Sequence, residues 1–127
     1  MGFYLSNKKE IPDLVISSTA IRAKTTADAT ISEGKWTCSL ELNADINGGD
    51  PIFLLNLAKS QDNSYSSICL VGHEPNFSIF IARSTNSSHQ SFSKGSMARM
   101  DFDVDKWEDI TMGLGNLSWL IAPMDIL

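Results

Sequence analysis

One stretch near the N-terminus constrains the fold more than any other. Three apolar residues, Leu14 to Ile16, are followed at once by Ser17 and Ser18, and Arg22 comes where alanines begin to recur at helical spacing. The pattern predicts a buried strand that leads directly into a helix, with Ser18 as its N-cap. The first turn of a helix has unpaired N–H groups and a positive dipole end, so an arginine there favours an anion. We therefore expect a phosphate site at this corner.

The rest of the chain alternates between strand-like and helix-like segments. The order predicts an α/β fold: a three-layer α/β/α sandwich with a mostly parallel sheet and an antiparallel C-terminal edge, in one domain spanning residues 1–127. We expect helices over 1–10, 18–31, 50–60 and 77–83, and strands over 14–17, 36–43, 68–71, 100–104 and 117–121.

Composition excludes several classes of protein. The net charge of −5 argues against binding to nucleic acid or to an anionic membrane, both of which need clustered Lys and Arg. The two cysteines, Cys38 and Cys69, fit no metal-ligand spacing and are expected to be buried, reduced thiols. There is no membrane-length apolar run, signal sequence, Walker loop or dinucleotide motif, so we expect a cytoplasmic protein with no cofactor and no metal.

A second polar cluster, Gly72-His73-Glu74, follows the apolar run at 68–71. If this strand runs parallel to the one at 14–17, both clusters lie at the carboxyl-end edge of the sheet, where open α/β sheets bind ligands. We therefore expect Arg22 and His73 to face one pocket. Each residue also has an ordinary structural explanation, because a lone histidine often donates to a backbone carbonyl and a lone arginine is often only solvated.

These residues resemble a known family. The segment from Leu14 to Ala27 resembles the Ser-Ser-x-x-x-Arg-Ala-x-x-Thr-Ala signature of the histidine phosphatase superfamily, which is phosphoglycerate mutase-like. Gly72 to Pro75 is similar to its Gly-His-x-Pro segment. The resemblance covers nearly the whole chain, and residues 94–103, Trp107 and 120–123 are similar to the short bacterial branch, the phosphohistidine phosphatases.

The resemblance implies a role for each polar residue at the two strand ends. In this family a nucleophilic histidine takes the phosphoryl group, and positive groups hold the phosphoryl oxygens in the transition state. Arg22 would be one of these clamps, and His73 would be a catalytic histidine that donates a hydrogen bond to the phosphoryl oxygens. The resemblance further implies phosphate-binding positions at Ser17, Gly72 and Asn76, and a possible general acid at Glu74, which could equally hold the turn.

The sequence departs from the family at one motif. The first strand of the family ends in Arg-His-Gly, which supplies the nucleophile, and this tripeptide is absent from the chain. His89, in a polar Ser-rich loop at 85–93, is expected to be exposed without a role. We expect the missing strand to reflect truncation, a start-site error, a degenerate non-catalytic descendant or completion by a partner strand. An unpaired sheet edge would then permit self-association.

The resulting functional prediction is a phosphohistidine phosphatase-type hydrolase that acts on protein phosphohistidine or a small phosphorylated molecule. Without Arg-His-Gly, the chain as it stands is expected to be inactive or very poor. Two alternatives remain open: a non-catalytic phosphate-binding module, and a small-metabolite phosphatase, although no inserted substrate cap is visible.

Overall fold

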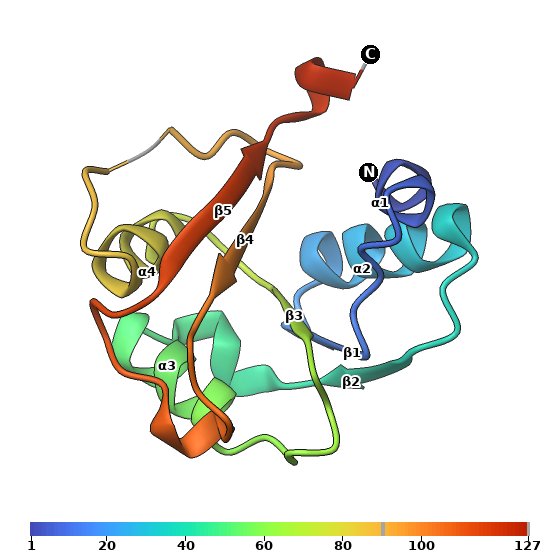
Figure 1. The fold of residues 1–127 in the computed structure, drawn as a ribbon. Coiled ribbons are helices and arrows are strands. Elements are labelled where there is room, and N and C mark those ends of the chain that lie inside the picture. The colour runs from blue at the N-terminus through green and yellow to red at the C-terminus, as the bar shows by residue number, and fades with distance from the viewer. Residues whose placement is uncertain (90, 127) are drawn as a thin grey trace. The chain divides into compact units, whose positions relative to one another are not determined.

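A computed structural model describes residues 1–89 and 91–126 of the chain. These residues form two compact units (Figure 1). The first unit contains residues 1–48 and 64–73 together with Ile126, and the second unit contains residues 49–63 and 74–125.

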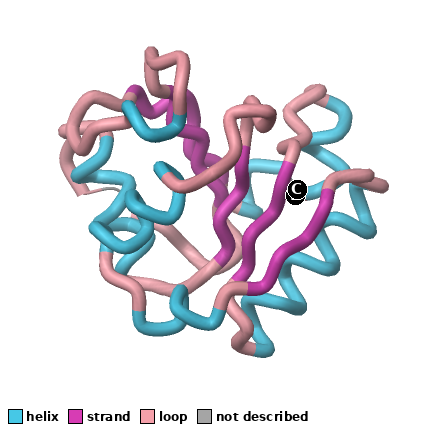
Figure 2. Tube along the Cα trace, turned by 90° about the horizontal axis from the view of Figure 1, so that it is seen from below, coloured by secondary structure: helices cyan, strands magenta, loops and turns pink. Residues whose placement is uncertain are grey.

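The first unit contains a parallel three-stranded sheet. Its order is β2-β1-β3, and Figures 1 and 2 show these strands as neighbours. At their carboxyl ends, Ser17 lies opposite both Leu42 and Val71. The residues that follow these strands therefore start from one edge of the sheet. The elements, in order, are α1 (Gly2–Asn7), β1 (Leu14–Ser17), α2 (Ile21–Gly34), β2 (Ser39–Leu42), a 3₁₀ turn (Ala44–Gly48) and β3 (Ile68–Val71).

The apolar pattern explains why β1 is the central strand. All four of its residues are buried, as expected for a strand with a neighbour on each side and both faces covered. Helix α2 buries Ala23 and Ala27, whose small side chains allow a helix to approach closely. The packing of α2 on β1 and β3 thus fixes where this helix begins in the first unit.

Helices α1 and α2 lie side by side in the first unit and are joined by a tight polar contact (Figure 1). The Trp36 indole Nε1 donates to Ser6 Oγ at 3.0 Å, and Ser6 Oγ donates to the Gly34 carbonyl at 2.6 Å. Trp36 itself is buried. This contact requires the two helix backbones to come very close at Gly2 and Gly34.

The second unit consists of helices and an antiparallel pair of strands. Strand β4 pairs with β5 from Met97 opposite Ile121 to Asp101 opposite Asn116, with a register shift between Arg99 and Met100. The core residues of this unit include Leu54, Ala58, Phe80, Ile81 and Ile110. The elements are α3 (Pro51–Lys59), α4 (Asn76–Ser84), β4 (Met97–Asp101), a 3₁₀ turn (Trp107–Asp109) and β5 (Asn116–Ile121), followed by a 3₁₀ turn at Pro123–Ile126.

The structure confirms the mixed α/β class and the strands expected at 14–17 and 68–71. Two expected strands have different bounds: the one at 36–43 is shorter and limited to β2, and the one at 100–104 lies earlier in the chain, because β4 begins at Met97 and ends at Asp101. Among the described residues β3 pairs with β1 alone, while β4 and β5 pair with each other, so each of these three strands has one unpaired edge. The missing family strand remains a prediction.

The side chain of Asp50 caps helix α3, and this cap gives a testable contribution to stability. Asp50 Oδ1 accepts a hydrogen bond from the Phe53 N–H at 2.8 Å, and Pro51 occupies the first helical turn. Asp50→Ala is expected to lower the free energy of unfolding by about 1 kcal/mol, whereas Asp50→Asn, which keeps an equally good cap, should leave it nearly unchanged. Urea denaturation of both variants checks this, and equal losses in the two would contradict it.

Candidate functional site

The carboxyl ends of β1 and β3 bring two polar side chains of the first unit together. Ser18 Oγ and His73 Nε2 lie 2.8 Å apart, within hydrogen-bonding distance. The backbone supports this contact, because the Ser18 N–H donates to the Val71 carbonyl at 2.9 Å, two residues before His73. Parallel pairing of β1 and β3 is therefore the physical cause of the contact between Ser18 and His73.

Ser18 is fully buried and does not cap α2. The N-cap position is Ala20, and the helix begins without a side-chain cap. The interpretation of Ser18 as an N-cap is therefore wrong. Its hydroxyl instead contacts His73, donates to Asn47 Oδ1 and accepts the Ala20 N–H at 3.1 Å.

Arg22 lies in the first turn of α2 with an exposed side chain. Within residues 1–89 and 91–126, its guanidinium makes no hydrogen bond or ion pair. Lys24, on the same helix, differs in that its Nζ lies 3.5 Å from Asp28 Oδ2. Arg22 therefore presents a cation whose hydrogen-bonding capacity is available to a ligand.

The other predicted residues of the first unit have less accessible positions. Ser17 is fully buried and its Oγ donates to the Ser18 carbonyl at 2.9 Å, so this hydroxyl is already used within the chain. Gly72 is half-buried and joins the end of β3 to His73. The phosphate-binding roles expected for Ser17 and Gly72 remain predictions.

Glu74 and Asn76 belong to the second unit, and each has a structural partner there. Glu74 Oε1 accepts the Ser78 N–H at 2.7 Å, and Asn76 Nδ2 donates to the Gly49 carbonyl at 2.6 Å. The contact of Glu74 fits the alternative in which it holds the turn before α4. Its role as a general acid, and that of Asn76 in phosphate binding, remain predictions.

Two side chains had no predicted role but make specific contacts. Asn47, in the 3₁₀ turn Ala44–Gly48, accepts from Ser18 and donates through Nδ2 to Thr19 Oγ1 at 3.1 Å. His89 is exposed, as expected, and its Nε2 lies 3.1 Å from Ser78 Oγ in the second unit. Gln90, in the same loop, lies outside the described residues.

The two cysteines are free, and each residue taken as a whole is half-buried, although the thiol of Cys69 is buried. Cys69 lies in β3, and Cys38 immediately precedes β2. Desolvation raises the pKa of both thiols, and for Cys69 burial of the thiol, with a smaller repulsion from Cys38, raises the pKa to about 12. Neither cysteine therefore has the lowered pKa of a nucleophilic thiol.

The raised pKa of Cys69 predicts a pH dependence of stability. The folded-state pKa of about 12 exceeds the ordinary value of 9.0, so the unfolded chain loses its proton first as the pH rises. Cys69 therefore stabilises the fold below about pH 9, and this contribution declines between about pH 9 and 12 by up to about 1.4 kcal/mol per unit. Urea denaturation at about pH 8 and pH 10 should show a larger fall in the wild type than in Cys69→Ala. Equal falls would contradict the prediction.

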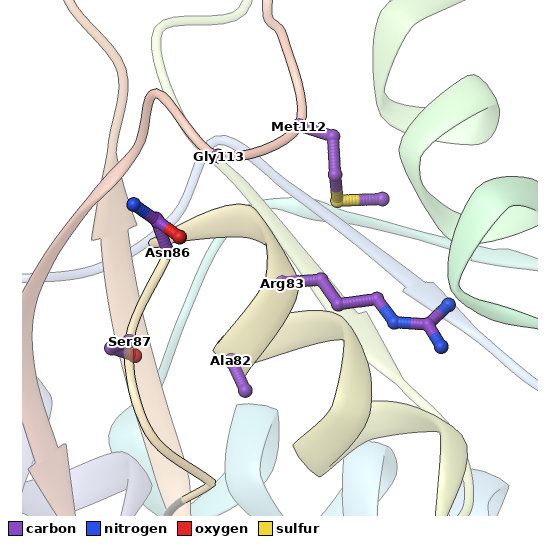
Figure 3. Close-up of a pocket in the computed structure, with 6 residues that line it drawn as sticks. All are labelled: Ala82, Arg83, Asn86, Ser87, Met112 and Gly113. Atoms are coloured by element: carbon purple, nitrogen blue, oxygen red, sulfur yellow. The ribbon is translucent and has the colours of Figure 1, made fainter.

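A pocket of about 440 Å³ occurs in the second unit, at the C-terminal end of α4. In Figure 3 the guanidinium of Arg83 extends away from Asn86 and Ser87, so the polar groups do not converge. The pocket residues are Ala82, Arg83, Asn86, Ser87, Met112 and Gly113. This pocket therefore carries no chemistry comparable to the Ser18–His73 contact.

The described part of the chain lacks two common features: a cluster of metal ligands and a membrane-spanning helix. No group of three or more His, Cys, Asp or Glu side chains there could hold a metal ion. None of its helices has the length and apolar character needed to span a bilayer.

The fold is similar to that of solved structures described as SixA phosphatases. No family model and no curated protein matches the sequence. The protein assigned as phosphohistidine phosphatase SixA of Agrobacterium tumefaciens is 19% identical, with a TM-score of 0.78 over 96% of this chain and 75% of that one. Its counterpart in Nakamurella multipartitia is 19% identical, with a TM-score of 0.77 over 96% and 77%. A protein histidine phosphatase SixA complexed with tungstate is 20% identical, with a TM-score of 0.75 over 99% and 78%.

Proposed function

We propose that this chain is a phosphohistidine phosphatase-type protein whose first unit holds a phosphoryl group with Arg22 and His73. The observation that carries the proposal is the 2.8 Å contact between Ser18 Oγ and His73 Nε2. This contact holds the imidazole at the end of β1. The chain continues from that end into α2, whose first turn carries the exposed Arg22. The fold neighbours support it, because they are described as phosphohistidine phosphatases and one of them carries tungstate, an oxyanion.

The chemistry of these two side chains suits a phosphoryl group. The planar fork of an arginine can bind two oxygens at once through charge-assisted hydrogen bonds. An imidazole N–H adds a further donor at the point where negative charge must be stabilised during phosphoryl transfer. In hydrolysis through a covalent intermediate, a histidine nitrogen forms the new P–N bond as the leaving group departs, and water then breaks that bond and releases phosphate. The substrate class we propose is protein phosphohistidine or a small phosphorylated molecule.

The residues present favour binding over turnover by the chain as it stands. Its two histidines are His73 and His89, and it contains no Arg-His-Gly that would supply the family's nucleophile. His73 is engaged with Ser18, and His89 with Ser78. This observation favours a second candidate, a non-catalytic phosphate-binding module. A small-metabolite phosphatase is a third candidate, and no observation in the structure favours it over the other two.

Two measurements on the same protein distinguish these functions. Tungstate binding is measured by isothermal titration calorimetry, and hydrolysis is measured with phosphohistidine as substrate. Binding without turnover is expected, and it favours the binding module or a site completed by another polypeptide. Turnover by the chain alone that is abolished in His73→Ala would instead establish the hydrolase and overturn the expected inactivity. If the chain neither binds tungstate nor hydrolyses phosphohistidine, the proposal is refuted.

A further inference from the structure

The hydrogen bonds around Ser18 use the full capacity of its hydroxyl group. A serine hydroxyl has one proton to donate and two lone pairs to accept with. Its three partners in the first unit are the Ala20 N–H, the Asn47 Oδ1 atom and the His73 Nε2 atom. An N–H can only donate and a carbonyl oxygen can only accept. The hydroxyl proton therefore goes to Asn47, and Ala20 takes one of the lone pairs.

Only one lone pair of Ser18 Oγ then remains for His73, so His73 Nε2 must carry the proton of their hydrogen bond. We infer that Ser18 and Asn47 are positioning residues that fix His73 with its proton on Nε2 and leave Nδ1 as the nitrogen offered to a ligand. The orientation of Asn47 is essential to this assignment. The structure places Oδ1 of Asn47 against Ser18 Oγ and Nδ2 at 3.1 Å from Thr19 Oγ1, whose hydroxyl oxygen accepts in this orientation.

The surroundings of Ser18 make this arrangement specific. Ser18 has 0% of its surface exposed, so water does not compete for its hydroxyl. The backbone N–H of Ser18 donates to the carbonyl of Val71 at the end of β3. The N–H of Asn43 donates to the carbonyl of Ser17 at the end of β1, at 2.8 Å. The turn that carries Asn47 and the strand that leads to His73 are therefore both anchored to the same strand end. Side-chain partners of this kind determine which imidazole nitrogen is protonated.

The inference deepens the proposed function and rests on it for the identity of the ligand. An oxyanion held by Arg22 would meet Nδ1 of His73. For Nδ1 to donate to a phosphoryl oxygen it must be protonated while Nε2 keeps its own proton for Ser18. The complex would then contain an imidazolium, whose positive charge adds to that of Arg22. Ser18 and Asn47 touch no reacting atom, and they act only through the ring of His73.

Nuclear magnetic resonance of the ¹⁵N-labelled histidine ring tests the assignment directly. The free protein above neutral pH should show His73 as the Nε2–H tautomer, with its signals identified by comparison with His89→Gln. Asn47→Ala should give a mixture of tautomers, because the acceptor for the Ser18 proton is lost. Asn47→Asp keeps an acceptor and should restore the Nε2–H form. Gly48→Ala is the matched control, since a Cβ there has nothing within 4 Å.

Two outcomes would overturn the inference. An Nδ1–H tautomer in the wild type would mean that the Asn47 amide is reversed and donates to Ser18. A tautomer unchanged by Asn47→Ala would mean that Asn47 does not position the ring.

Tungstate binding should also weaken about 3- to 10-fold in Asn47→Ala, the size of one lost neutral hydrogen bond. If the predicted tautomer is seen but tungstate does not bind, the proposed function fails and the positioning role stands. If tungstate binds in a way that depends on Arg22 but His73 shows the Nδ1–H tautomer, the positioning role fails and the proposed function stands.

Discussion

Gly2→Ala and Gly34→Ala are each expected to lower the free energy of unfolding by about 1–3 kcal/mol, although alanine is the better helix former. A Cβ at Gly2 would lie 1.9 Å from the Thr30 carbonyl oxygen. One at Gly34 would lie 2.4 Å from the Trp36 Nε1 atom and 2.6 Å from the Gly2 carbonyl oxygen. Since the obstacles include backbone atoms, α1 and α2 must move apart, and the bond between Trp36 and Ser6 is lost or lengthened.

Urea denaturation followed by circular dichroism measures these losses. Gly48→Ala provides the matched control, because it makes the same chemical change where a Cβ meets nothing within 4 Å. It should alter the free energy of unfolding by less than about 0.5 kcal/mol. If Gly2→Ala or Gly34→Ala instead stabilised the protein by the helix propensity of alanine, the close packing of α1 on α2 would be wrong.

Arg22→Ala is expected to weaken tungstate binding by about 10- to 100-fold. The guanidinium is exposed and supplies charge-assisted hydrogen bonds, each contributing about 1.5–3 kcal/mol when it is made to a charged group. Removal of the side chain also removes a positive charge from the first turn of α2. The loss should appear in the dissociation constant measured by calorimetry and leave the free energy of unfolding nearly unchanged.

Lys24→Ala separates a specific contact from the general effect of charge. Lys24 lies on the same exposed stretch of α2 and carries the same charge, but it pairs with Asp28. Its removal should weaken tungstate binding by less than about threefold, because charges outside direct contact are screened by salt. Equal effects of the two substitutions would show that net charge, and not the guanidinium of Arg22, determines binding.

Sequence reasoning predicts those elements whose signal is local. The run Leu14 to Ile16 reads as a buried strand because it is continuously apolar, and β1 is indeed buried on every residue. Alternation at Met100, Phe102 and Val104 predicts a strand at 100–104, which is further along the chain than the observed strand. Strand β4 ends at Asp101 because its partner β5 begins opposite it, at Asn116. A local pattern contains no information about where a partner strand begins.

The candidate site was predicted only in part for the same reason. Arg22 and His73 follow recognisable strand ends, but the assignment of Ser18 as a helix cap overlooked its contact with His73. Asn47 lies in a turn 29 positions from Ser18, and its role depends on the parallel register that sets the end of β2 beside the end of β1. No residue pattern near Asn47 indicates this contact.

The most direct test of the central claim is a crystal structure of the protein with tungstate. We predict tungstate oxygens within about 2.7–3.2 Å of the Arg22 guanidinium and of Nδ1 of His73, with Nε2 of His73 still bound to Ser18. Tungstate bound elsewhere, with Arg22 and His73 making no contact with it, would contradict the assignment of a phosphoryl site to the carboxyl end of β1.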